Sequence, residues 1–548
     1  MKKQILLRLW RIVLISSVCF LSKISYAQTP DWLWAKSAGG TSDDYANSVA
    51  ADASGNTYVA GWFDSYPLIF GSTTLTNAGG EDIFLVKYDA AGNVLWAKSA
   101  GGIYDDYAYS VAVDTSGNIY VAGWFYSPTI IFGSTTLTNA GHDNIFLAKY
   151  DTSGNVLWAK SAGGIFNDEA CSVAVDASGN IYVAGLFSSP TLTFDSTTLT
   201  NVGNNDILLV KYDTSGNVLW AKSAGGSSSD FANSVAVDTS GNTYVAGLFF
   251  SSTLSFGSTT LTNAGGIDIF LAKYDANGNV LWAKSAGGVD YDDAYSVAAD
   301  ASGNIYVAGV FSSPTLSFGS TTLTNAGGYD IFLTKYDAGG NVLWAKSAGG
   351  TGNDLAYSVA VDTSGNIYVA GYFRSPTIAF GITTLTNAGS RDIFLAKYDA
   401  AGNVFWAKSA GGTDYDEANS VAVNASGNIY VAGVFRSPTI TFGSTTLTNA
   451  SLDDIFLAKL GSDTITKINE LSNSLNISVF PNPATNNIII ESPHQAVIEI
   501  SNIQGQLIKT LAANSNKTSV DVSAFPSGMY FVKVKAEKGI AVKKFVKE

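Results

Sequence analysis

An aspartate recurs at one place in a long repeated sequence, directly after a short segment that changes from copy to copy. The seven positions are Asp44, Asp106, Asp168, Asp230, Asp292, Asp354 and Asp416. A ring of carboxylates could hold a hard cation such as calcium, which prefers oxygen ligands, or could accept hydrogen bonds from sugar hydroxyls. A residue present in every copy can equally cap a loop or join neighbouring units, and we favour that structural role. We predict that the chain binds no metal or other cofactor. Calcium is the one cofactor that the pattern of aspartates could accommodate.

Aromatic side chains occupy the variable segment in several copies. They are Tyr104, Phe166, Tyr291 and Tyr415. An aromatic ring can stack on a sugar ring or a peptide, but it can also pack beneath its own loop. Because the copies are otherwise nearly identical, these residues, together with the recurring aspartates, are the candidates for ligand contact.

Adjacent acids beside these segments are candidate catalytic residues of a glycoside hydrolase. The pairs are Asp105 with Asp106, Asp292 with Asp293, and Asp416 with Glu417. Sequence adjacency does not set the separation of the two carboxyl groups that this chemistry requires. Several copies carry such a pair, whereas an active site usually breaks symmetry. We therefore predict that the chain is not an enzyme.

Other catalytic groups are scarce. Cys171 is the one cysteine after residue 27, and the two histidines, His142 and His494, lie in different segments. A catalytic thiol needs a histidine partner, so Cys171 is predicted to be a packed small residue. The sequence contains no glycine-rich phosphate loop, histidine-based metal cluster or nucleophile motif.

The repeated part of the chain is strongly acidic. Residues 28–460 contain 38 Asp and Glu against 17 Lys and Arg, a net charge of −21. Such a surface repels phosphate backbones, and no basic patch with interleaved aromatic residues is present. These features exclude nucleic-acid binding as a predicted function.

One repeated unit must position these residues. The string Trp-Ala-Lys-Ser-Ala-Gly-Gly begins, at a constant step of 62 residues, at Trp34, Trp96, Trp158, Trp220, Trp282, Trp344 and Trp406. In the second full copy, alternating or clustered apolar residues predict four strands, A to D, at 110–114, 119–125, 145–150 and 156–160. Each unit is therefore predicted to be a four-stranded antiparallel sheet.

Turn chemistry distinguishes two faces of each sheet. The pentapeptide Asp-x-x-Gly-Asn joins A to B at 114–118 and C to D at 151–155, and it suits a tight hairpin in which Asp caps the turn and Gly takes a left-handed conformation. The opposite face carries the long B-to-C segment, 126–144, and the variable D-to-A loop. We expect function on that face. The residue after the glycine of strand B also varies, and we interpret it as outward packing of the blade: Trp62, Trp124, Leu186, Leu248, Val310, Tyr372 and Val434.

The fold class follows from the number of units and from the ends of the array. Seven such sheets bury their faces by radial stacking, which predicts an all-β, seven-bladed β-propeller. The array begins with a D-type strand at 32–36 and ends with a C-type strand at 455–460. The N-terminal strand is therefore predicted to complete the last blade and to close the ring, hiding two sheet edges.

Residues 106–123, DYAYSVAVDTSGNIYVAG, resemble the bacterial β-propeller repeat family called SBBP. The resemblance extends over all the units and implies the same fold and an extracellular context, without one established activity. The sequence departs from the family at Ser127 and Pro128, where the family carries a Phe-Pro pair.

The N-terminus has the three zones of a secretory signal. Lys2, Lys3, Arg8 and Arg11 precede an apolar run at 12–21, which is too short for an ordinary membrane span, and 25–27 has the small-x-small cleavage pattern. We predict a signal peptide at 1–27, cleavage between Ala27 and Gln28, a propeller at 28–460, and no transmembrane span in the mature chain.

The composition changes after residue 460. A polar linker at 461–474 precedes a segment at 475–548 that is similar to the type A C-terminal sorting domain of the type IX secretion system. The matching residues are Pro481, Asn482, Pro483, Gly528, Tyr530, Lys543 and Lys544. The resemblance implies a small immunoglobulin-like β-sandwich, recognition by an outer-membrane translocon, and a protein secreted from, or held on the outer surface of, a Gram-negative bacterium.

These features together predict a noncatalytic binding or adhesion protein that recognises a glycan or another protein through the variable loop face. An extracellular polysaccharide hydrolase or lyase, or a purely structural surface protein, is the alternative.

Overall fold

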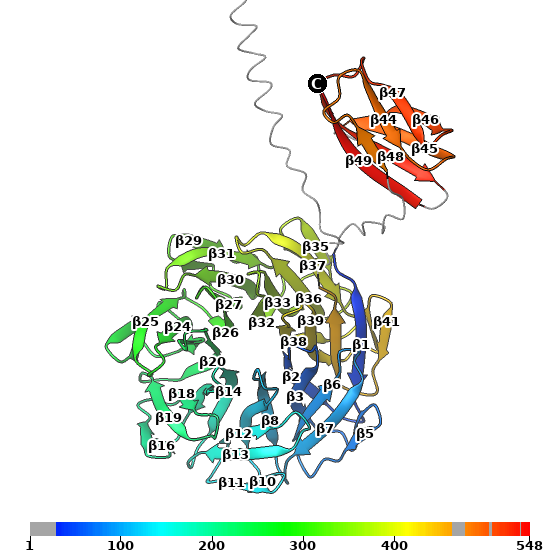
Figure 1. The fold of residues 1–548 in the computed structure, drawn as a ribbon. Helices are drawn as coiled ribbons and strands as arrows, with labels where there is room; N and C mark the ends of the chain where they lie inside the picture. The colour runs from blue at the N-terminus through cyan, green and yellow to red at the C-terminus, as the bar shows by residue number, and fades with distance from the viewer. Residues whose placement is uncertain (1–28, 463–476, 503–506, 537–538) are drawn as a thin grey trace, which may run out of the picture. The chain divides into compact units, whose positions relative to one another are not determined.

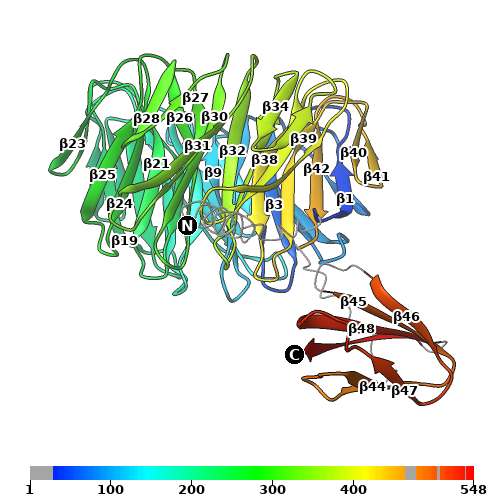
Figure 2. The same ribbon diagram turned by 90° about the horizontal axis from the view of Figure 1, so that it is seen from above.

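The computed structural model describes residues 29–462, 477–502, 507–536 and 539–548, and their regular elements are all strands (Figures 1 and 2). The chain divides into two compact units between Asp463 and Thr464. Within the described ranges, no helix has the length and hydropathy of a membrane span. The predicted signal peptide, its cleavage at Ala27 and Gln28, and most of the predicted linker lie outside these ranges.

The first unit consists of seven four-stranded antiparallel sheets, which stand around a common axis like blades (Figure 1). Blades are numbered 1 to 7 in the order of their innermost, A strands: β2 (Asp44–Ala51), β8 (Asp106–Val113), β14 (Asp168–Val175), β20 (Asp230–Val237), β26 (Asp292–Ala299), β32 (Asp354–Val361) and β38 (Asp416–Val423). The B strands follow: β3 (Thr57–Phe63), β9 (Ile119–Phe125), β15 (Ile181–Phe187), β21 (Thr243–Phe249), β27 (Ile305–Phe311), β33 (Ile367–Phe373) and β39 (Ile429–Phe435). The C strands are β6 (Asp82–Tyr88), β12 (Asn144–Tyr150), β18 (Asp206–Tyr212), β24 (Asp268–Tyr274), β30 (Asp330–Tyr336), β36 (Asp392–Tyr398) and β42 (Asp454–Leu460). The D strands are β7 (Val94–Ala100), β13 (Val156–Ala162), β19 (Val218–Ala224), β25 (Val280–Ala286), β31 (Val342–Ala348), β37 (Val404–Ala410) and, for blade 7, β1 (Trp32–Ala38). The predicted seven-bladed β-propeller is the fold.

Strand A begins earlier than its apolar pattern predicted. In blade 2 it starts at Asp106 instead of residue 110, and Asp106 pairs with Phe125. The register shifts between Ala108 and Ser110, so a bulge interrupts the alternation on which the prediction was based.

Each B-to-C segment, predicted as a connection, contains a further hairpin at the periphery of its blade. The pairs are β4 (Leu68–Phe70) with β5 (Thr73–Leu75), β10 (Thr129–Phe132) with β11 (Thr135–Thr138), β16 (Thr191–Phe194) with β17 (Thr197–Thr200), β22 (Thr253–Phe256) with β23 (Thr259–Thr262), β28 (Thr315–Phe318) with β29 (Thr321–Thr324), β34 (Thr377–Phe380) with β35 (Thr383–Thr386), and β40 (Thr439–Phe442) with β41 (Thr445–Thr448). Gly133, at φ +59°, makes the turn in blade 2. These strands are too short for their alternation to be distinctive.

The Asp-x-x-Gly-Asn turns form as their chemistry predicted. Asp114 Oδ1 accepts hydrogen bonds from Ser116 N at 2.9 Å and from Asn118 N at 2.8 Å. Gly117 adopts φ +82°, which a residue with a Cβ disfavours. These turns leave the opposite face to the variable D-to-A loops.

The hydrophobic core lies between neighbouring blades and not within one of them. One cluster, for example, combines Tyr58 and Leu85 of blade 1 with Phe125 and Phe146 of blade 2. Because a blade buries its faces only against its neighbours, the arrangement is stable as a complete ring.

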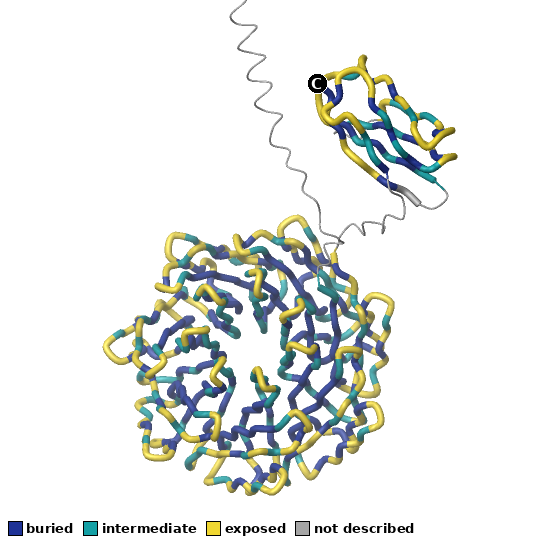
Figure 3. Tube along the Cα trace, in the orientation of Figure 1, coloured by how far each residue is buried: buried dark blue, intermediate teal, exposed yellow. Residues whose placement is uncertain are grey.

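The ring closes as predicted, through the N-terminal strand. Strand β1 pairs with β42, with Trp34 opposite Lys459 and Ala38 opposite Ile455. Blades 7 and 1 also meet near the axis, where Asp44 N donates to Asp453 O at 2.8 Å. Figure 3 shows the buried residues following the blades all the way round.

The C-terminal unit is a small β-sandwich. A sheet of β43 (Ser478–Phe480), β44 (Asn487–Glu491) and β47 (Lys517–Asp521) faces a sheet of β46 (Leu507–Ala513), β45 (Ala496–Asn502), β48 (Gly528–Ala536) and β49 (Gly539–Lys547). Ile488, Ile498 and Val532 belong to the buried core between them.

Candidate functional site on the variable face

The seven repeated aspartates lie beneath the variable loops and not on their surface. Asp106 accepts hydrogen bonds from Ser127 Oγ and Gly102 N, both at 2.8 Å, and from Tyr126 N at 3.1 Å. The side chain thereby joins the D-to-A loop to the end of strand B. All seven are fully buried: Asp44, Asp106, Asp168, Asp230, Asp292, Asp354 and Asp416. This position supports the capping role and corrects the idea of an open carboxylate ring for calcium or sugar hydroxyls, because buried and bonded oxygens are not presented to a ligand.

A second ring of buried side chains, which the sequence analysis did not single out, begins the C strands. It consists of Asp82, Asn144, Asp206, Asp268, Asp330, Asp392 and Asp454, and each Oδ1 lacks a hydrogen-bond partner among the described residues. A Cβ on Gly101 would come within 1.9 Å of Asp82 Oδ1, so the first glycine of Ala-Gly-Gly makes room for this carboxylate. Burial, and to a smaller extent the charge of Asp106 in the next blade, raise the pKa of Asp82 to about 7.

The four loop aromatics that were predicted to contact a ligand differ in their exposure to solvent. Tyr104 and Phe166 are 47% and 48% exposed, so their rings are available for contact. Tyr291 and Tyr415 are half-buried, and the ring of Tyr291 lies 5.5 Å from that of Tyr329. The loop aromatics therefore do not form one continuous platform.

Two further variable positions, not singled out from the sequence, meet at the junctions between blades. One immediately precedes strand C and is occupied by Glu81, Asp143, Asn205, Ile267, Tyr329, Arg391 and Asp453; the other is the second residue of strand A and is occupied by Tyr45, Tyr107, Glu169, Phe231, Asp293, Leu355 and Glu417. The backbone brings them together, since Asp106 N donates to Glu81 O at 2.7 Å and Asp44 N to Asp453 O at 2.8 Å. Tyr45 Oη donates to Asp453 Oδ2 at 2.6 Å, and Arg391 forms an ion pair with Glu417. Aligning the repeats column by column would have revealed both positions, because each lies directly beside an aspartate that nearly every repeat keeps.

The residue after the strand B glycine also belongs to this junction region, which corrects its interpretation as outward packing. The ring of Trp62 stacks on that of Tyr45 at 4.5 Å and lies 5.1 Å from that of Tyr107 in blade 2. Tyr107 in turn stacks on Trp124 at 4.4 Å. The position lies on the same face of the sheet as the second residue of strand A, because the two residues pair directly.

Positive charge on the variable face is confined to blades 6 and 7. The propeller's three arginines, Arg374, Arg391 and Arg436, lie there, whereas its lysines lie in strands C and D. Arg436 Nε and Nη2 donate to the two carboxylate oxygens of Asp453 at 2.9 and 2.6 Å. The Arg391 guanidinium lies 4.8 and 4.6 Å from the rings of Tyr372 and Tyr415. Acids at these junctions are therefore matched by cations.

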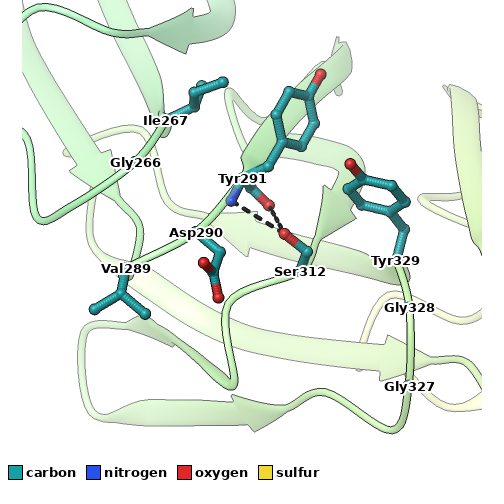
Figure 4. Close-up of a pocket in the computed structure, with 9 residues that line it drawn as sticks. All are labelled: Gly266, Ile267, Val289, Asp290, Tyr291, Ser312, Gly327, Gly328 and Tyr329. Atoms are coloured by element: carbon teal, nitrogen blue, oxygen red, sulfur yellow. Dashed lines mark hydrogen bonds between the residues drawn. The ribbon is translucent and has the colours of Figure 1, made fainter.

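A cleft of about 560 Å³ opens on the variable face at blade 5 (Figure 4). Figure 4 shows Ser312 between the two tyrosines, and its Oγ donates to Tyr291 O at 2.9 Å and accepts from Tyr291 N at 3.0 Å. The volume lies within the range of small-molecule sites. The lining residues are Gly266, Ile267, Val289, Asp290, Tyr291, Ser312, Gly327, Gly328 and Tyr329.

The cysteine considered as a catalytic thiol, Cys171, lies on β14. Burial raises the pKa of the Cys171 thiol, which leaves it protonated and unreactive at neutral pH. Within the described ranges, no group of three or more His, Cys, Asp or Glu side chains is arranged to hold a metal ion.

In the sorting-domain motif, the structure brings the Pro-Asn-Pro segment against the last strand. Asn482 Oδ1 accepts from Val546 N at 2.9 Å, Lys543 and Lys544 are exposed on that strand, and Pro481 and Pro483 flank the asparagine. Tyr530 serves the core instead: it is buried, its ring lies 5.5 Å from that of Phe545, and its Oη donates to Pro526 O at 2.8 Å. Gly528 begins β48 opposite Lys547.

Comparison with known families supports both resemblances. Residues 478–548 match the secretion system C-terminal sorting domain, and residues 95–124, 219–248 and 343–372 match the SBBP beta-propeller repeat.

Curated relatives match at lower identity. One relative is an uncharacterized WD repeat-containing protein of Acanthamoeba polyphaga mimivirus, to which the chain is 27% identical in an alignment of 505 residues. The match covers 75% of this chain and 36% of the relative. The chain is 25% identical over 377 residues, 64% of its length and 38% of the relative's, to the regulatory protein FlaEY of Caulobacter vibrioides. The chain thus spans little more than a third of these relatives.

Two solved structures resemble the chain at low sequence identity. One is PorZ, a surface component of the type IX secretion system of Porphyromonas gingivalis, with 11% identity and a TM-score of 0.20. The match covers 94% of this chain and 100% of the PorZ chain. Sqt1 from Chaetomium thermophilum covers 79% with 99% of its own at 10% identity and a TM-score of 0.35.

The sorting domain implies interaction with the type IX secretion machinery and indicates export. The chain is therefore a secreted or outer-surface protein that joins SBBP-type β-propeller repeats to a secretion-system C-terminal sorting domain.

Proposed function

We propose that the chain is a noncatalytic binding protein outside the cell, and that it recognises a glycan through the cleft at blade 5. The observation that carries the proposal is the pair of tyrosine rings, Tyr291 and Tyr329, beside polar groups in one open cleft on the face where the repeats differ.

The lining of the cleft suits a sugar. A sugar ring presents C–H groups on one side, which pack on aromatic faces, and hydroxyls around its edge, which need donors and acceptors. Tyr329 and Tyr291 supply the rings, and Asp290, which is exposed, and Ser312 supply oxygens. Blade 5 alone carries a tyrosine directly before strand C, so this chemistry occurs once in the ring.

Replacing Tyr329 by alanine is expected to weaken glycan binding about tenfold, since a stacked aromatic ring contributes about 1 kcal/mol beyond the area that it buries. Asp290→Asn should weaken it further by removing a charged acceptor. The measurement is a glycan array on the chain purified after secretion, followed by calorimetric titration with the oligosaccharides retained.

Tyr104→Ala is the matched control, because it removes an exposed tyrosine from the same face outside the cleft. Equal losses for Tyr104→Ala and Tyr329→Ala, or no glycan retained by the unmodified chain, would show that the cleft is not a glycan site. Conversion of a bound oligosaccharide to shorter products would overturn the noncatalytic assignment.

A further inference from the structure

The junctions between blades 1 and 2 and between blades 2 and 3 contain acids without cations. Glu81, Asp105, Asp143 and Glu169 are half-buried, and none forms an ion pair with Lys or Arg in the described part of the chain. His142 is exposed, and its charge lowers the pKa of the adjacent Asp143 against the effect of burial. Burial is the main reason that the pKa of Glu81 and the pKa of Glu169 both rise to about 7. The neighbouring Asp105 raises the pKa of Glu81 further, and Asp143 does the same for Glu169. Glu81 and Glu169 are therefore held in an environment that disfavours their charge.

The junction between blades 6 and 7 shows what the same positions look like when a cation is present. There Arg391 forms an ion pair with Glu417 and lies 4.8 Å from the ring of Tyr372. The residues that occupy the equivalent positions at the junction of blades 2 and 3 are Asp143 for Arg391, Glu169 for Glu417 and Trp124 for Tyr372. That junction keeps the carboxylate and the aromatic wall but replaces the cation with a second acid.

Exposed apolar side chains accompany these acids on the variable-face loops. Ile103, Tyr104, Tyr126, Ile165 and Phe166 are 62%, 47%, 37%, 60% and 48% exposed. The rings of Tyr104 and Tyr126 lie 5.2 Å apart. Exposed apolar groups beside charged side chains are typical of protein-binding surfaces.

We propose that this acidic sector, defined by Glu81, Asp105, Asp143 and Glu169 with the apolar residues named above, docks a basic polypeptide segment. One arginine or lysine of the partner takes the place at the junction of blades 2 and 3 that Arg391 takes between blades 6 and 7, and its apolar neighbours contact Tyr104 and Phe166. Charge complementarity identifies the partner: the propeller carries −21, and this sector has no lysine or arginine of its own. The proposal is independent of the glycan cleft, which lies on blade 5.

The test uses the chain purified after secretion and a capped nonapeptide of alternating arginine and serine, titrated by calorimetry. Glu169→Gln is expected to weaken binding about tenfold, as for loss of a partly buried charge pair. Asp143→Arg is expected to abolish binding and to raise the melting temperature, because the new arginine can pair with Glu169 as Arg391 does with Glu417. Asp414→Asn removes one charge from a D-to-A loop outside both the sector and the cleft, and it should leave peptide binding unchanged.

Proton release gives a second readout that a merely structural role would not produce. A bound cation favours the ionised acids, so at pH 7 the peptide should release protons and the binding enthalpy should depend on the buffer. No binding by the unmodified chain, equal binding of an alternating glutamate and serine peptide, or unchanged binding by Glu169→Gln overturns the proposal. Equal affinity for spermidine also overturns it, since the sector would then take a free polyamine. Glycan binding by the Glu169→Gln variant is measured in parallel and should be unchanged. A loss of peptide binding alone then concerns the acidic sector and not the glycan cleft.

Discussion

Deleting residues 28–36 is expected to lower the melting temperature of the propeller by on the order of 10 °C. The deletion removes most of β1, which supplies the fourth strand of blade 7 and pairs with β42. Each lost backbone hydrogen bond contributes about 1 kcal/mol, and buried contacts disappear with them. Trp32, whose ring lies 5.0 Å from that of Phe442, and Ala35, which is 5% exposed, belong to those contacts. Thermal unfolding followed by circular dichroism measures the shift.

The ring should weaken without opening completely, because blades 7 and 1 also meet near the axis. Val49 N donates to Ser420 Oγ at 3.1 Å, and Asp44 N donates to Asp453 O at 2.8 Å, and neither bond involves β1. The exposed edge of β42 should also promote association between molecules.

A synthetic peptide of residues 28–38, added to the truncated chain, provides the matched control. It should restore most of the melting temperature, whereas a scrambled peptide of the same composition should not. If the truncated chain unfolds at the same temperature as the intact one, closure by β1 contributes nothing to stability.

The fold could be predicted from the sequence because one unit recurs without insertion or deletion. Strand B of blade 2 was predicted at 119–125 and spans Ile119–Phe125, since the tight turn at 114–118 fixes its register against strand A. Strand A was predicted four residues short, because the bulge between Ala108 and Ser110 breaks the alternation. The local sequence pattern therefore predicted the bounds of a strand correctly where the backbone is regular.

The site was less accessible to sequence reasoning, because it is made of residues that meet only across junctions. Arg391 and Glu417 belong to different blades. Tyr45 and Asp453 belong to the first and last blades, so they lie far apart in the sequence although they are in contact. Their contact depends on radial packing, which repeat spacing alone does not describe. Burial was equally hidden: Asp106 is fully buried, whereas Tyr104, two residues earlier, is 47% exposed.

The propeller is expected to be more stable at pH 5 than at pH 8, with a melting temperature higher by on the order of 5–10 °C. The cause is the double ring of buried aspartates. Burial raises the pKa of Asp44 and Asp82 from ordinary values of 3.8 to about 7. It raises the pKa to about 6 for Asp106, Asp206, Asp268, Asp330, Asp416 and Asp454.

The sign follows from the direction of these shifts. A group whose pKa is raised on folding contributes stability that is complete below pH 3.8 and is lost as the pH rises through 6 to 7. The turn aspartates act in the opposite direction: hydrogen bonds from Asn93 lower the pKa of Asp89, so its contribution is lost only as the pH falls below 3.8. The two sets together place maximum stability at mildly acidic pH, which differential scanning calorimetry across the range would locate.

Asn144 supplies the variant that tests this account. It occupies the position of Asp82 in blade 2, so the fold already accepts a neutral amide there. Replacing Asp206, Asp268 and Asp330 together by asparagine should raise the melting temperature at pH 8, where the carboxylates are charged, and change it little at pH 5. Asp89→Asn, the same chemical change in an exposed turn, should instead lower stability at pH 8 by removing a carboxylate that accepts several hydrogen bonds. A triple variant that is less stable than the unmodified chain at pH 8 would mean that the buried carboxylates are worth more as hydrogen-bond acceptors than they cost as buried charges.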